Sequence, residues 1–125
     1  MADILVVDDS KFIVSALRRA LEKDGHTVVG SGHDGNEGFQ LFLSLNPDLT
    51  LLDITMPNRD GRDCLEDIIE ADADARVIMI SAIKEQEIVD SCIEHGARDF
   101  IQKPLKLGDE QDLQAFYAKI AQALS

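Results

Sequence analysis

Short apolar runs recur along this chain, and four of them end at a polar residue. These four cover residues 4–7, 49–52, 77–80 and 100–102. The residues that follow them include Asp8, Asp9, Asp53, Ser81 and Lys103. Runs of this length are typical of strands buried on both faces of a parallel sheet. Stretches with helical spacing separate the runs, and this alternation predicts an α/β fold.

Five strands and five helices are expected in strict alternation. The strands are expected at Ile4–Val7, Thr27–Gly30, Asp48–Leu52, Arg76–Ile80 and Asp99–Gln102. The helices are expected from a cap at Ser10 to Asp24, from near Asp34 to Asn46, around Cys64–Ile69, over Glu85–His95 and over Leu113–Leu124. The apolar spacing also places Phe12 and Ile93 on inward helix faces. The pattern predicts a doubly wound (βα)5 sheet of five parallel strands in the flavodoxin-like order 2-1-3-4-5.

Length and composition limit what the chain can do. With 125 residues and a final helix that runs almost to Ser125, residues 1–125 are expected to form a single domain without an output domain in this chain. The 24 acidic and 12 basic residues give a net charge of −12, which argues against direct nucleic-acid binding. No apolar run approaches the roughly 20 residues that span a bilayer, so no membrane insertion is expected. Cys64 and Cys92 fit small buried side chains in a reducing cytoplasm.

The polar residues at the strand ends predict a site. Carboxyl ends of neighbouring parallel strands meet at one crevice, and the predicted order places strands 1 and 3 side by side there. Asp8 and Asp9 would then lie next to Asp53. Three close carboxylates repel one another, so a cation is expected to compensate them. Mg²⁺ prefers such oxygen ligands and bridges to phosphate, whereas zinc would favour His or Cys.

Ser81 and Lys103 extend this site toward a phosphoryl group. Lysine is usually exposed, but Lys103 ends a strand just before a proline, where its ammonium can pair with Asp53 and then with phosphate oxygens. The Ser81 hydroxyl can donate to a phosphoryl oxygen, although a simple turn cap is the alternative.

The chain resembles the receiver domains of two-component response regulators, the CheY-like family, over essentially its whole length. The resemblance rests on Asp8-Asp9, on Asp53 with Met56-Pro57 and Gly61 after it, on Ser81-Ala82 and on Lys103-Pro104. It implies that Asp53 accepts a phosphoryl group from the phosphohistidine of a sensor histidine kinase or phosphotransfer protein. Such a chain is a signalling switch that catalyses only its own phosphorylation and dephosphorylation.

The resemblance also implies individual roles. Asp9 would bind Mg²⁺ directly, Asp8 mainly through water, and the backbone carbonyl of Thr55 would be a further ligand beside Asp53. Ser81 and Lys103 would bind the phosphoryl oxygens. Thr55 and Ile83 would flank the path of the hydrolytic water and tune dephosphorylation.

Switching is expected to involve Ser81 and Phe100. By resemblance, they would alter a face formed by the fourth helix, fifth strand and fifth helix, which a downstream protein or a second receiver would bind. Ser81 stands where threonine is frequent in the family, and Phe100 stands where tyrosine is frequent. The family also commonly has a cis bond before the proline that matches Pro104.

Three other functions fit the sequence less well. A degenerate receiver would act as an interaction module without phosphorylation, but the acid pair, acceptor, hydroxyl and lysine are all present. A haloacid dehalogenase-like phosphatase would carry a second aspartate two residues after the nucleophile, where this chain has Thr55. A flavodoxin would bind a flavin phosphate after the first strand, where Asp8 and Asp9 would repel it.

Overall fold

The computed structural model describes residues 1–125 as a five-stranded sheet with helices on both faces. The strands are β1 (Asp3–Val7), β2 (Thr27–Gly32), β3 (Leu49–Leu52), β4 (Val77–Ser81) and β5 (Asp99–Gln102). The helices are α1 (Lys11–Lys23), α2 (Gly35–Leu45), α3 (Gly61–Ala71), α4 (Gln86–Glu94) and α5 (Glu110–Leu124). All strand pairs are parallel and the order is β2-β1-β3-β4-β5, which confirms the predicted fold class.

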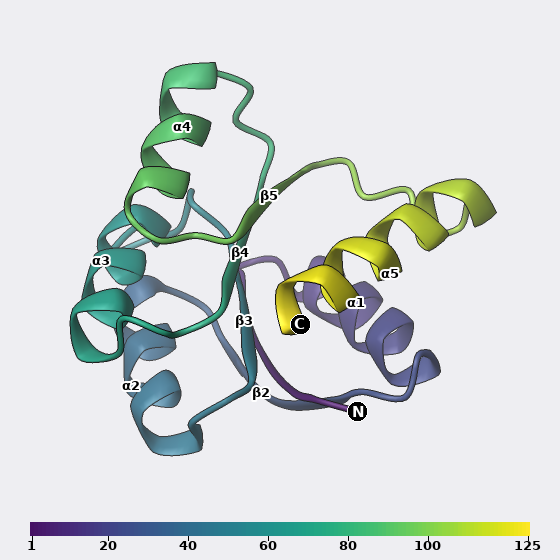
Figure 1. Ribbon diagram of the computed structural model, residues 1–125, viewed down its shortest axis with the longest axis horizontal. Coiled ribbons are helices and arrows are strands. Elements are labelled where there is room, and N and C mark those ends of the chain that lie inside the picture. Colours follow the sequence, from purple (N-terminus) through teal and green to yellow (C-terminus); the bar gives the residue numbers. More distant parts are fainter.

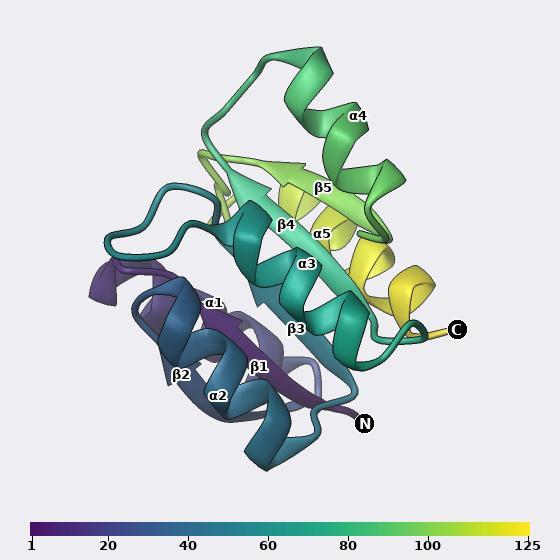
Figure 2. The ribbon, with the colours of Figure 1, turned by 90° about the vertical axis from the view of Figure 1, so that its left-hand side faces the viewer.

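Successive side chains along the strands pack into two separate cores, one on each face of the sheet. In β1, Ile4 and Val6 join the core beneath α1 and α5, whereas Leu5 and Val7 join the core beneath α2, α3 and α4. Figure 1 shows these two helical layers on either side of the sheet, and Figure 2 shows α2, α3 and α4 in front of it. Because both faces are covered, the central strands read as continuous apolar runs.

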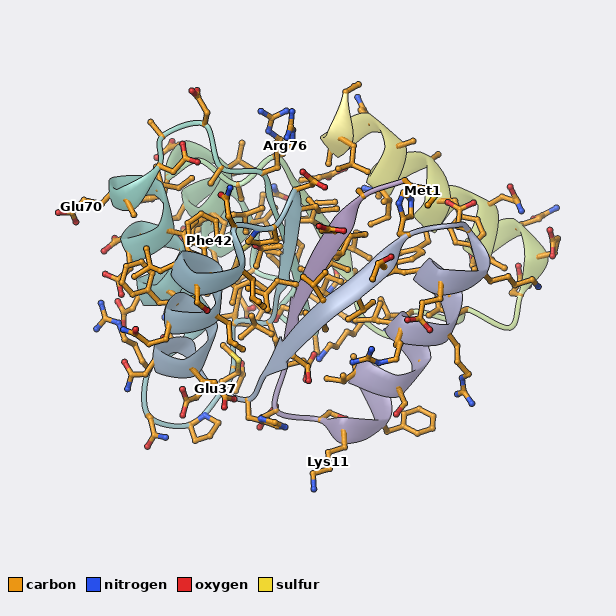
Figure 3. All side chains as sticks on the ribbon, turned by 90° about the horizontal axis from the view of Figure 1, so that it is seen from below. Met1, Lys11, Glu37, Phe42, Glu70 and Arg76 are labelled. Atoms are coloured by element: carbon orange, nitrogen blue, oxygen red, sulfur yellow. The ribbon has the colours of Figure 1, made fainter.

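Most helices begin at a capped residue at the edge where the strands end. Ser10, Asp34, Asp60 and Asp109 accept backbone hydrogen bonds at the starts of α1, α2, α3 and α5. Such caps satisfy donors that the first helical turn leaves free. Lys11 and Glu37, at the starts of α1 and α2, lie at the same end of the molecule and opposite Arg76, which precedes β4 (Figure 3). None of the helices is long and apolar enough to cross a membrane.

Several predicted boundaries and faces were wrong. β2 runs on to Gly32 because it pairs with the end of β1, although its Gly-Ser-Gly sequence has low strand propensity. β3 begins at Leu49 instead of Asp48, and β4 runs one residue later than predicted, from Val77 to Ser81.

Two apolar helix residues also face the solvent instead of a core. Phe12 is 75% exposed in the first turn of α1, and Ile93 is 45% exposed because α4 buries only Cys92 completely. Cys64 and Cys92 are free and buried, as the sequence predicted.

Candidate functional site

The backbone places two of the aspartates side by side. β1 and β3 are neighbours, and Val7 pairs with Leu52 at the ends of these strands. The amide of Asp53 donates to the carbonyl of Val7 at 2.9 Å, and the amide of Asp8 donates to Gly32 at 3.0 Å. The sheet therefore fixes Asp8 and Asp53 next to each other at its carboxyl edge, where the strand arrows end in Figure 2.

Three carboxylates gather at this edge. Asp8, Asp9 and Asp53 each offer an oxygen, and these oxygens lie within 4.8 Å of one another. Asp8 is 2% exposed and Asp53 is 5% exposed, whereas Asp9 is open to the solvent. Asp8 accepts from the amide of Ser10 at 2.9 Å, so its carboxylate is held in place.

Lys103 contacts both buried acids from the end of β5. Its Nζ lies 2.8 Å from Asp8 Oδ2 and 3.5 Å from Asp53 Oδ2. The sequence predicted pairing with Asp53, but the shorter contact is to Asp8. The Lys103–Pro104 peptide bond is cis.

The electrostatics of the crevice follow from burial and crowding. Burial, and then the nearby Asp8 charge, raise the pKa of Asp53 to about 6, although Lys103 opposes the shift. Burial lowers the pKa of Lys103, but the hydrogen bond to Asp8 and the Asp53 charge outweigh it, so the pKa is raised. One ammonium thus faces three carboxylates, and the site carries excess negative charge.

The donor set fits Mg²⁺. All three side chains provide carboxylate oxygens, which this ion prefers, and no His or Cys joins the cluster. Burial and the Asp8 charge both raise the pKa of Asp53, and a divalent cation would offset the repulsion between these carboxylates. The open carboxylate of Asp9 leaves the cluster accessible from solvent.

The remaining predicted residues lie in β4, in β5 and in the loops that follow β3 and β4. Ser81 is the last residue of β4 and is 1% exposed, and its Oγ accepts from the Ile83 amide at 3.2 Å. Thr55 is exposed in the loop after β3, and Ile83 is half-buried in the loop after β4. Phe100 is half-buried in β5 and packs against the core beneath α2, α3 and α4.

A profile described as "Response regulator receiver domain" matches residues 4–115. This chain belongs to the response regulator receiver family. Two relatives from Bacillus subtilis support this: protein CcdB is 43% identical over 85% of this chain and 88% of its own length. The chemotaxis protein CheY is 41% identical over 82% of this chain and 86% of its own. The chain is therefore a receiver domain, and it is similar to chemotaxis proteins among others.

Solved structures agree with this assignment. A CheX–CheY–BeF3–Mg²⁺ complex from Borrelia burgdorferi contains a chain with a TM-score of 0.90 and 35% identity, covering 98% of this receiver and 89% of that chain. The response regulator domain of Thermotoga maritima CheB has a TM-score of 0.88 and 35% identity, and the match covers 98% of this receiver and 95% of that chain. Receivers of this kind are signalling switches that bind Mg²⁺ at an acidic pocket and interact with other proteins.

Sequence reasoning missed a polar network in the loop after β3. Asn58 donates from Nδ2 to Asp34 Oδ2 at 2.7 Å, and the Gly35 amide donates to the Arg59 carbonyl at 2.8 Å. Arg59 also forms a two-point ion pair with Asp67 of α3. The proline, asparagine and glycine of this loop mark a turn in the sequence, but no local sequence pattern shows which other loop the turn contacts.

A second missed feature is an apolar groove of about 550 Å³ beside α1. Phe12 and Ile13 of α1 line it from one side, and Leu105 and Leu107 of the loop after β5 line it from another. Three basic residues also line the groove, Arg19, Lys23 and Lys106. The exposed Phe12 ring was predicted to face the core, so the pattern hid this surface.

Proposed function

We propose that this receiver is a phosphoacceptor of a two-component phosphorelay, with Asp53 as the acceptor and Mg²⁺ as the cofactor. The observation that carries the proposal is the position of Asp53. Its carboxylate is buried, lies within 4.8 Å of two other carboxylates, and is 3.5 Å from an ammonium. A degenerate receiver has no need for this costly arrangement of charges.

The chemistry follows from the residues present. An Asp53 oxygen attacks the phosphorus of a phosphohistidine, the phosphorus–nitrogen bond breaks, and the imidazole leaves with that electron pair. Asp8, Asp9, Asp53 and the carbonyl of Thr55 would hold Mg²⁺, which neutralises charge on the phosphoryl oxygens. Lys103 adds a positive charge, and Ser81 turns its hydroxyl toward a phosphoryl oxygen.

Labelling tests the acceptor directly. The protein is incubated with Mg²⁺ and acetyl phosphate, and intact mass and peptide mapping follow. We expect one phosphoryl group at Asp53 and none in Asp53→Asn. Equal labelling of the Asn variant would refute the assignment. No labelling of the natural sequence by any donor would favour the phosphorylation-independent interaction module instead.

The output is proposed to be read on the face of α4, β5 and α5. Ser81 ends β4 and Phe100 lies on the adjacent strand, where Met79 pairs with Phe100 in register. When Ser81 moves toward the phosphoryl group, Phe100 turns inward to fill the space, because an apolar ring gains free energy on burial. The phosphoryl group thereby favours one of two states, and a downstream protein or second receiver binds that state.

The phosphodonor protein is proposed to dock at the groove beside α1. The groove includes Pro104, which directly follows Lys103, so an occupant would lie beside the crevice residue that contacts Asp53. Its apolar lining and its basic residues favour a helix with apolar and acidic side chains. The positive charges stand out on a chain with a net charge of −12, so charge complementarity favours such a donor surface.

A further inference from the structure

The loop between β3 and α3 is attached to the start of α2 at its tip. Asn58 donates to Asp34 Oδ2 at 2.7 Å, and the backbone of Gly35 donates to Arg59 at 2.8 Å. No side chain could replace the hydrogen of Gly35, because a Cβ there would overlap the carbonyl of Arg59. The two loops therefore touch through their backbones as well as through one pair of side chains.

Asp34 makes two contacts with one carboxylate. Its Oδ1 accepts from the Glu37 amide at 2.8 Å and caps α2, while its Oδ2 accepts from Asn58. Asn58 has a φ of 66°, a left-handed conformation that asparagine tolerates better than most residues. The pair thus joins a rigid helix start to a turn of defined shape.

Thr55 lies in the same loop, next to the acceptor. On one side, the Gly61 amide donates to the Ile54 carbonyl at 2.8 Å and closes the base of the loop. On the other side, Met56 is buried in the core, while Thr55 itself is exposed. The direction of the Thr55 carbonyl therefore depends on how the loop runs from this base to its attached tip.

We propose that the Asp34–Asn58 hydrogen bond positions the Thr55 loop at the crevice, and thereby sets the affinity for Mg²⁺ and the lifetime of the acyl phosphate. This inference rests on the proposed function, which gives Thr55 its place beside the metal and the hydrolytic water. A loop released from α2 samples more conformations, and ordering it again on binding costs free energy. Asp34 and Asn58 are positioning residues, since neither belongs to the acidic cluster.

An exchange of the two side chains tests the contact without changing the net charge. Asn58→Asp sets two carboxylates against each other and loses the hydrogen bond, whereas Asp34→Asn keeps only a weaker one, because two neutral amides replace an amide and a charged acceptor. In the double variant, the new asparagine keeps an oxygen for the Glu37 amide and donates its NH2 group to the new aspartate. The total stays at the −12 of the natural sequence.

Mg²⁺ affinity is measured by calorimetry on the unphosphorylated protein, and acyl-phosphate half-life is measured with radiolabelled phosphate. We expect Asn58→Asp to bind Mg²⁺ roughly three- to tenfold more weakly, which corresponds to the net free energy of one ordinary hydrogen bond, and Asp34→Asn to bind Mg²⁺ more weakly by a smaller factor. We also expect faster amide hydrogen exchange at Thr55 and an altered half-life. The double variant should recover all three properties.

Charge alone predicts the opposite result for one variant. If charge alone mattered, the carboxylate added near the cluster would tighten Mg²⁺ binding in Asn58→Asp. Asn36→Asp, on the exposed surface of α2, measures the effect of an added charge without changing either side chain of the Asp34–Asn58 pair. Tighter binding by Asn58→Asp, or single variants that match the natural protein, would overturn the proposal. If the natural protein itself took up neither Mg²⁺ nor beryllium fluoride, the proposed function would be the part that failed.

Discussion

Lys103 Nζ lies 2.8 Å from Asp8 Oδ2, closer than to the proposed acceptor Asp53 at 3.5 Å. The lysine therefore compensates a metal-site carboxylate first and reaches the acceptor second. Burial, and then the Asp8 charge, raise the pKa of Asp53 to about 6, and the more distant Lys103 ammonium offsets only part of this shift.

Asp53→Asn should stabilise the metal-free protein. The raised pKa means that the folded state binds a proton more tightly than the unfolded state between about pH 4 and pH 6. The stability of the natural protein therefore falls as pH rises through this window, and at pH 7 the ionised carboxylate costs about 1–3 kcal/mol. Urea unfolding without metal should show a more stable variant at pH 7 and a smaller difference at pH 5. A less stable variant at pH 7 would contradict carboxylate crowding.

Lys103→Met should destabilise the metal-free protein by about 2 kcal/mol, because the nearly buried Asp8 loses its partner. Mg²⁺ should restore part of this loss, since it binds the native state. The control is the double variant Lys103→Met/Asp8→Asn, which has no unpaired buried carboxylate at position 8, so its stability should return. Equal destabilisation of the single and double variants in urea unfolding would show that the loss comes from packing.

Ile83→Glu should shorten the life of the acyl phosphate. Ile83 is half-buried in the loop after β4, and its side chain offers no hydrogen bond to orient water and, in the proposed role, would obstruct the water's approach. A carboxylate there can orient the attacking water, and we expect hydrolysis about tenfold faster, equivalent to about 1.4 kcal/mol of barrier. Radiolabelled phosphate release measures the rate, and Ile83→Met serves as the apolar control. An unchanged rate in the Glu variant would refute this role.

Beryllium fluoride should turn Phe100 inward. The ring is half-buried in the present state and packs against one core, so further burial is available to it. Fluorinated phenylalanine and fluorine NMR can follow the ring, with Phe116 as the control because it is only 4% exposed and packs from α5 into the other core. The Phe100 signal should shift with Mg²⁺ and beryllium fluoride while the Phe116 signal stays. Unshifted signals at both positions would exclude this switch.

Phe12→Ser should slow phosphorylation by a phosphohistidine donor but not by acetyl phosphate. The small molecule needs only the crevice, whereas a protein donor also needs the groove that Phe12 lines. Leu43→Ser is the control, since Leu43 is an apolar residue of α2 that is 51% exposed away from the groove. We expect transfer at least about tenfold slower, as for loss of one buried aromatic anchor. Equal slowing by both substitutions would place the donor elsewhere.

The fold was accessible from the sequence because its signals are local. The apolar residues of the five strand runs and of the helical segments between them recur at different spacings, and glycine or proline ends several of these segments. The type and order of the elements therefore follow directly. The strand extension to Gly32 was not accessible, because pairing with β1 overrides the weak propensity of its Gly-Ser-Gly sequence. Phe12 was misplaced because helical spacing indicates a shared face, not whether another element covers that face.

The cluster was also partly accessible, since Asp8, Asp9 and Asp53 follow directly from strand ends that meet at one edge. The Asp34–Asn58 contact was not, because it joins two loops 24 residues apart whose approach depends on helix packing. The preference of Lys103 for Asp8 likewise depends on side-chain geometry across β1 and β5, which no local pattern contains.

The hydrogen bond from the Asp53 amide to Val7 ties the proposed chemistry to the native strand register. Successive side chains of a strand face opposite ways, so a slip of one residue between β1 and β3 would turn Asp53 away and bring Ile54 to Asp8. Only a correctly paired sheet can then receive the phosphoryl group. Misfolded copies of this receiver could not be phosphorylated, so every phosphorylated molecule would be a correctly folded one.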